Sequence, residues 1–261
     1  MDEHDASKAE IAAYELLPLL RLYKDGRVEG LLGNDFVPPS TNPQNGVVSK
    51  DITLVPEFNI TARIYLPPIP DPNPNPKLPL VVYFHVSGFC VASPFTSKCQ
   101  HYLNTLVAHA RVVSVSWIIS HHDRNGPEAW LNDHADFERV FLAGESAGAN
   151  IARNMALKAG QPEFGLSVGL LGVALVHPYF WGSVPIGSEA LAGIGCGMVL
   201  VCVAERDRGR LYCEALSGSG CTRVVEIDET KDEDHVFDLY DLDGQNARDL
   251  IRQLASFFNG G

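Results

Sequence analysis

A serine between two glycines is the residue in this sequence best placed to do covalent chemistry. The stretch Gly144-Glu145-Ser146-Ala147-Gly148 follows the apolar run "RVFLAG" and leads into "AGANIARNMALKAG", which has the composition of a helix. A serine at such a strand-to-helix corner is typical of a nucleophile elbow, where small neighbours let the chain turn sharply and expose the hydroxyl. The N-terminus of the following helix would favour negative charge beside the serine. The alternative is that Ser146 only caps this helix.

A serine hydroxyl is a poor nucleophile unless a base removes its proton. His235 lies in "DEDHVF", between the last expected strand and the last expected helix, and a loop at the carboxyl ends of parallel strands can carry it over Ser146. His177, at the end of an earlier strand, is the weaker candidate. The acid is expected after "MVLVCVA", where "ERD" offers Glu205 and Asp207. We favour Asp207 as the group that would orient the imidazole.

The negative charge that develops on a carbonyl oxygen needs fixed backbone donors. The stretch "YFHVSGF" (83–89) follows the first long strand, where esterases and lipases place an HGGG-type element. The backbone amides of Ser87 and Gly88, together with that of Ala147, are therefore the candidate oxyanion donors.

The elements that position these residues alternate along the chain. Apolar strands are expected over 78–84, 111–117, 139–144, 168–176, 198–204 and 223–228, and helices over 99–110, 147–160, 209–217 and 244–258. Strands that are apolar throughout, separated by helices, indicate a mostly parallel central sheet with helices on both faces, the α/β class. We expect a single domain over 1–261, in which 1–45 is partly lid- or cap-like. A helix interrupted at Pro18 is expected over 9–23.

Composition and charge exclude several classes of function. The chain has 261 residues, 46% hydrophobic and 20% charged, with a net charge of -12. Such a charge repels phosphate backbones and anionic membrane surfaces, so we expect neither a nucleic-acid nor a membrane partner. The acidic start and six scattered cysteines without a CxxC pair favour a cytoplasmic protein. The sequence does not indicate an oligomeric state.

No metal or cofactor is expected from the sequence. Adjacent histidines in His121-His122-Asp123 rarely point at one metal, and no second set of ligands stands nearby. The acidic run over 228–235 lacks the regular spacing of oxygen ligands that calcium requires, so an exposed loop is expected.

Several longer stretches resemble the plant carboxylesterases, a branch of the hormone-sensitive-lipase-like α/β hydrolases. They are "LYKDGRVEGLLG", "FHVSGFCVASPFTSK", "GPEAWLNDHADFERVFLAGESAGANIARNMALKAG", "HPYFWGSVPIGSE", "VLVCVAERDRGRLY" and "DEDHVFDLY". This resemblance implies an α/β-hydrolase fold, hydrolysis of short carboxylic esters of small molecules and no cofactor. It also implies a triad of Ser146, Asp207 and His235, with an oxyanion hole at 85–88.

The chain departs from the family pattern in two ways. The HGGG element reads His85-Val86-Ser87-Gly88, and side chains at 86 and 87 are expected to restrict the backbone and crowd the acyl site. Three stretches, after "VVSVSW", after "PIGSE" and within "AERDRGRLY", are shorter than in the family, which predicts a reduced cap region. Because of the third gap, Asp207 matches either of two family aspartates, and only the first would be the triad acid.

These departures leave alternatives to a fully active esterase. A catalytically impaired member or a receptor-like ligand-binding protein is one, although receptors that resemble this family have lost the histidine that His235 matches. A dehydratase of hydroxylated isoflavanone-type substrates is the other. A threonine at the nucleophile position would favour the dehydratase, whereas Ser146 favours the esterase.

Overall fold

The computed structural model describes most of the chain. The described residues are 12–17, 20–31, 33–41, 45–58, 60–69, 77–88, 91–116, 128–164, 169–178, 194–204 and 224–260. The helix expected over 209–217, the candidate acids Glu205 and Asp207, and the His121-His122-Asp123 cluster lie outside these ranges.

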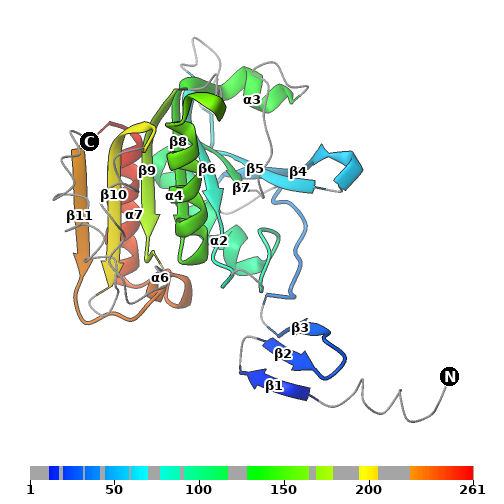
Figure 1. The fold of residues 1–261 in the computed structure, drawn as a ribbon. Helices are drawn as coiled ribbons and strands as arrows, with labels where there is room; N and C mark the ends of the chain where they lie inside the picture. Colours follow the sequence, from blue (N-terminus) through cyan, green and yellow to red (C-terminus); the bar gives the residue numbers. More distant parts are fainter. Residues whose placement is uncertain are drawn as a thin grey trace.

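An eight-stranded sheet forms the centre of the molecule, in the order β11-β10-β9-β8-β6-β7-β5-β4 (Figure 1). Its strands are β4 (Val48–Val55), β5 (Ile60–Leu66), β6 (Leu78–Phe84), β7 (Val113–Ser116), β8 (Ala135–Glu145), β9 (Leu170–Val176), β10 (Cys196–Ala204) and β11 (Val224–Thr230). Every neighbouring pair from β11 to β7 is parallel, whereas the two pairs at one edge, β7 with β5 and β5 with β4, are antiparallel. The expected mostly parallel sheet is confirmed.

Helices cover both faces of this sheet. The long helices are α2 (Ser97–Ala110), α4 (Ala147–Ala159) and α7 (Gln245–Phe258), and the shorter ones are α3 (Ala129–His134), α6 (Phe237–Tyr240), η1 (Pro56–Phe58) and η2 (Pro162–Phe164). Figure 1 shows α4 in front of the strands and α7 behind them. Among the helices that the structure describes, none combines the length and the apolar character needed to cross a bilayer.

Alternating side chains of β10 join different hydrophobic clusters on the two faces of the sheet. In β10, Leu200 and Cys202 join the cluster that contains α2 and α7, whereas Val199 and Val201 join the cluster under α4. All four are at most 1% exposed, and the full burial of a valine or leucine side chain contributes about 1.5–3 kcal/mol. The apolar strands of the sequence are therefore buried on both faces, which is why they read as continuous hydrophobic runs.

The helix expected over 9–23 is wrong. The segment instead forms β1 (Ala12–Leu16) and β2 (Leu20–Tyr23), which pair with β3 (Val28–Gly30) in a separate three-stranded antiparallel sheet. In Figure 1 this sheet stands apart from the central one. The apolar spacing of this segment favours a helix, but pairing between neighbouring strands overrides that local preference.

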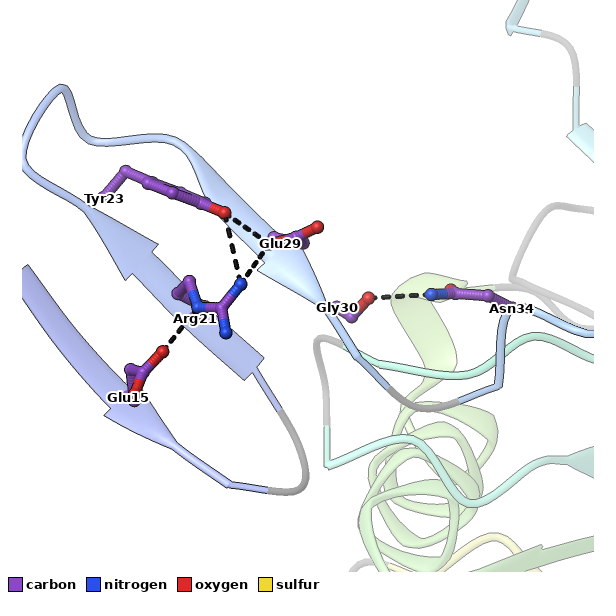
Figure 2. Close-up of polar contacts among 6 residues, drawn as sticks. All are labelled: Glu15, Arg21, Tyr23, Glu29, Gly30 and Asn34. Carbon is purple, nitrogen blue, oxygen red and sulfur yellow. Dashed lines mark hydrogen bonds and ion pairs between the residues drawn. The ribbon is translucent and has the colours of Figure 1, made fainter. Parts of the chain in front are cut away.

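Charged and polar side chains link the three N-terminal strands across one face (Figure 2). Arg21 of β2 donates to Glu15 of β1 at 2.5 Å and to Glu29 of β3 at 3.3 Å. The hydroxyl of Tyr23 donates to the same carboxylate of Glu29 at 2.5 Å, and this bond holds the pKa of Glu29 below its ordinary value. Cross-strand pairs of this kind stabilise a sheet by a few tenths of a kcal/mol to about 1 kcal/mol each.

Candidate active site

Ser146 occupies the sharp corner between β8 and α4. β8 ends at Glu145, α4 begins at Ala147, and Ser146 between them has φ 54° and ψ -116°. A non-glycine residue in such a conformation costs about 1–3 kcal/mol, and it persists only where the surroundings enforce it. Here the amide of Ser146 donates to the carbonyl of Val176 in the neighbouring strand at 2.9 Å. The Ser146 side chain makes no capping hydrogen bond to α4, so the helix-cap alternative is wrong.

Glycines on both sides of Ser146 allow the turn to pack against the sheet. A Cβ atom built on Gly148 would lie 2.1 Å from the carbonyl oxygen of Phe84 in β6, and one on Gly144 would lie 2.3 Å from the carbonyl oxygen of Gly148. Both neighbours are backbone atoms, which cannot rotate away as a side chain would. The elbow therefore needs glycine at 144 and 148 because there is no room for a methyl group.

Replacing Gly148 by alanine is expected to lower the free energy of unfolding by about 3 kcal/mol, because the added methyl group must push β6 away from α4. Urea unfolding followed by circular dichroism measures this change. Gly169→Ala is the matched control, since its Cβ would meet no atom within 4 Å and its φ is not positive. Equal midpoints for the two variants would contradict the steric account of the elbow.

His235 is brought from the far end of the chain to the serine. It lies between β11 and α6, and its Nε2 is 2.9 Å from the Oγ of Ser146. This distance is within the range of a hydrogen bond between an imidazole base and a nucleophile. A neutral imidazole whose Nε2 carries no proton can accept the hydroxyl proton in this position.

Two of the three candidate oxyanion residues border the same cavity as Ser146. Ser87 and Gly88 line this cavity, and Ala147 is the first residue of α4. Gly88 has a φ of +48°, which only glycine adopts readily, whereas neither Val86 nor Ser87 has a positive φ. The expected backbone restriction therefore does not arise at 86 and 87. The residue with the left-handed conformation in this element is Gly88, where the HGGG pattern also has glycine.

His85 begins this segment and is largely buried. Burial lowers the pKa of His85 to about 4, so its imidazole is neutral at pH 7. A neutral His85 brings no positive charge next to the serine.

The cavity in front of Ser146 has a volume of about 540 Å³. Such a volume suits a small-molecule ligand. Polar groups lie at the serine and along the 85–88 segment, whereas apolar and aromatic side chains form much of the remaining wall: Val91, Tyr102, Val236, Leu239 and Tyr240. The arrangement places the candidate nucleophile and the candidate base at one side of a mainly apolar pocket.

Four buried polar residues lie near the serine, and of these the sequence indicated only His177, as the weaker candidate base. Tyr83 donates from its hydroxyl to Oε2 of Glu145 at 3.1 Å, and Nε2 of His177 lies 3.5 Å from Oδ1 of Asp238. Burial, and then the charge of Asp238, raises the pKa of Glu145 well above its ordinary value. A carboxyl group at the end of an apolar strand was a signal for Glu145, but no sequence pattern links it to Asp238.

The structure brings Ser146, His235 and the candidate oxyanion residues together. It does not describe Asp207, so the position of the expected acid is not part of this geometry. Among the described residues, no group of three His, Cys, Asp or Glu side chains is placed to hold a metal ion.

The fold and the elbow together define an α/β hydrolase, and comparison with known proteins agrees. Residues 81–191 match a family model described as alpha/beta hydrolase fold. An esterase from Pyrobaculum calidifontis has a similar fold, with a TM-score of 0.61 and 22% identity, covering 80% of this chain and 84% of that one.

Closer relatives are found in plants. "Probable carboxylesterase 13" of Arabidopsis thaliana is 38% identical over 97% of this chain and 99% of its own length. A "2-hydroxyisoflavanone dehydratase" of Glycyrrhiza echinata is 35% identical over 93% of this chain and 95% of its own. The chain therefore belongs to the plant carboxylesterase family, a family of carboxylic ester hydrolases.

The length of one alignment agrees with the internal gaps inferred from the sequence. The match to "Probable carboxylesterase 13" extends over 326 positions, whereas this chain has only 261 residues. This chain therefore lacks segments that its relative contains.

Proposed function

We propose that this protein is a serine esterase that cleaves short carboxylic esters through an acyl-enzyme. Ser146 Oγ attacks the ester carbonyl while Nε2 of His235 takes the hydroxyl proton. The backbone amides of Ser87, Gly88 and Ala147 would stabilise the oxyanion. The alcohol leaves with the proton from His235, and water, activated by the same imidazole, then releases the carboxylic acid. The observation that carries this proposal is the distance of 2.9 Å between Nε2 of His235 and the Oγ of Ser146, which lies at the strained turn between β8 and α4.

The substrate class follows from the cavity. Its volume of about 540 Å³ and its apolar wall suit an uncharged ester of modest size. The mechanism needs no cofactor. Gly33 and Asp35 also line the cavity, which supports the proposal that the segment 1–45 is partly lid- or cap-like within a single domain.

Hydrolysis of p-nitrophenyl acetate and p-nitrophenyl butyrate by the purified protein tests the proposed function. Release of p-nitrophenol above the buffer rate, saturating with substrate, is the expected result. If a chain shown by circular dichroism to be folded matches the buffer blank with both esters, the proposal fails. The catalytically impaired or receptor-like alternative then replaces it.

Asp207 is proposed as the acid that orients His235. Asp207→Asn is expected to lower kcat for p-nitrophenyl butyrate by at least about 10²-fold, because the amide would favour the wrong tautomer of the imidazole. Glu205→Gln is the matched control, since it removes one carboxylate two residues away. A large loss in the Glu205 variant with none in the Asp207 variant would transfer the role to Glu205.

Dehydration of 2-hydroxyisoflavanones is the second candidate. It is favoured by the dehydratase from Glycyrrhiza echinata, which is almost as similar to this chain as the named carboxylesterases. Elimination of water needs a base but no acyl-enzyme, so the two reactions differ in their need for the Ser146 hydroxyl. Formation of an isoflavone from a 2-hydroxyisoflavanone, measured by its absorbance, with no hydrolysis of p-nitrophenyl esters, would favour the dehydratase.

A further inference from the structure

Two fully buried carboxyl groups lie close in the chain to the serine and the histidine. Glu145 is the last residue of β8, immediately before Ser146. Asp238 belongs to α6 and follows His235 by three residues. Both carboxyl residues are 0% exposed. The two groups therefore sit on the two chain segments that carry the nucleophile and the proposed base.

The hydrogen bonds of these carboxyl groups are incomplete if both are ionised. Oε2 of Glu145 accepts a bond from Tyr83, but Oε1 of Glu145 and both oxygens of Asp238 have no hydrogen-bond donor among the described residues. His177 Nε2, at 3.5 Å from Asp238, contributes opposite charge when the imidazole is protonated. Buried acceptors without donors lower the free energy of unfolding, so one of the two carboxyl groups must carry a proton.

A single proton on the pair allows a hydrogen bond between the two carboxyl groups. Two neighbouring carboxylates cannot both be ionised in a dry site, and one of them keeps its proton. The pKa of Glu145 is raised by its burial and by the neighbouring charge of Asp238, so Glu145 is the group that stays protonated. Its O–H then donates to the carboxylate of Asp238, which gives one of the two Asp238 oxygens the donor that it lacks.

We propose that one proton shared between Glu145 and Asp238 fastens α6 to the end of β8 and thereby holds His235 at hydrogen-bond distance from Ser146. Both carboxyl residues act as positioning residues. The kinetic part of this inference rests on the proposed esterase function, whereas the shared proton does not.

Other titratable groups face the pair from the surrounding elements. Burial raises the pKa of Tyr83 and Tyr102 well above their ordinary value and that of Cys99 to about 12, so these groups stay neutral at physiological pH. His177 packs edge-on against His235, with ring centroids 5.8 Å apart. The facing groups are Tyr83 of β6, Cys99 and Tyr102 of α2, His177 after β9, Cys202 of β10, and His235.

The pH dependence of stability tests the shared proton. The pKa of Glu145 is higher in the folded chain than its ordinary value of 4.5. The protonated group therefore contributes most to the free energy of unfolding at low pH, and this contribution is lost as the pH rises from the ordinary value to the folded pKa. Glu145→Gln keeps a donor to Asp238 and an acceptor for Tyr83 but cannot ionise. Between about pH 5 and the folded pKa of Glu145, the unfolding equilibrium constant of the wild-type chain is expected to rise about tenfold per pH unit relative to that of the glutamine variant.

Glu138→Gln is the matched control, since it removes one exposed carboxylate from the same strand. Its unfolding equilibrium constant should change with pH in the same way as that of the wild-type chain over the same range. Parallel curves for wild type and Glu145→Gln would overturn the shared proton.

Infrared spectroscopy gives a second test that needs no stable variant. The folded wild-type chain at neutral pH should show the C=O stretch of a protonated carboxyl group, and this band should disappear on unfolding. Absence of the band in the folded chain would overturn the shared proton even if Glu145→Gln fails to fold.

Kinetics test the positioning role. The ratio of kcat for Glu145→Gln to kcat for wild type should rise with alkaline pH, because only the wild-type pair loses its proton. Glu145→Ala, which supplies no donor, should have a lower kcat than Glu145→Gln. A pH-independent ratio and equal kcat values for the two variants would overturn the positioning role. If no variant hydrolyses esters, the rate at which a fluorophosphonate labels Ser146 replaces kcat, so failure of the esterase proposal remains distinguishable.

Discussion

Replacing Ser146 by alanine is expected to lower kcat for p-nitrophenyl butyrate by at least about 10⁴-fold, to a rate near that of the buffer. The reason is that the covalent route has no other nucleophile at the elbow, where the Oγ of Ser146 lies 2.9 Å from the imidazole. Initial rates at saturating ester, with protein concentrations adjusted to detect slow turnover, measure the loss.

Ser256→Ala is the control for this variant, because Ser256 is an exposed serine on α7, outside the cavity. It should hydrolyse the ester at the wild-type rate. Ser146→Ala removes a hydroxyl that makes no capping hydrogen bond to α4. Circular dichroism is therefore expected to show the same fold as in the wild-type chain. Retained hydrolysis in Ser146→Ala would mean that the hydroxyl takes no part in the reaction.

His235→Gln should lower kcat by roughly 10⁴-fold. Glutamine is of similar length and can still form a hydrogen bond to Ser146, but its amide cannot accept and return a proton. The same assay measures the effect, and KM should change much less than kcat because His235 acts on the reacting atoms.

His101→Gln is the matched control for the histidine variant. His101 is exposed on α2, and it does not line the cavity. If both glutamine variants turn over ester at the same rate, His235 is not the base, and the contact with Ser146 would have only a structural role.

The central features of the site were predictable from residue types and order. Glycine at 144 and 148 around Ser146, between an apolar run and a helix-forming run, indicated a sharp strand-to-helix corner, and the structure has that corner. The region around His235 was predictable because it falls after the last strand, and parallel strands place such loops on one edge of the sheet. These inferences succeeded because they rest on local chemistry and on the order of elements.

Features that depend on contacts distant in sequence were not predictable. The residues of β1 and β2 have apolar spacing compatible with a helix, and only pairing with β3 and the bridges from Arg21 to Glu15 and Glu29 explain the strands. A single sequence contains no signal for these partners.

The buried carboxyl pair was hidden for the same reason. Glu145 and Asp238 lie on β8 and α6, far apart in the chain, and the acidic surroundings of His235 indicated an exposed loop. In the structure Asp238 is fully buried in the first turn of α6, three residues after His235. Burial of one acid in an acidic stretch depends on the folded environment and not on composition.

The most direct test of the central claim is to find where a fluorophosphonate attaches to the folded protein. Mass spectrometry after digestion should locate one adduct, on the peptide that contains Ser146, with no adduct in Ser146→Ala and much slower labelling in His235→Gln. A folded wild-type chain that stays unlabelled, or that carries its adduct on another residue, would contradict the account of an activated serine at this corner.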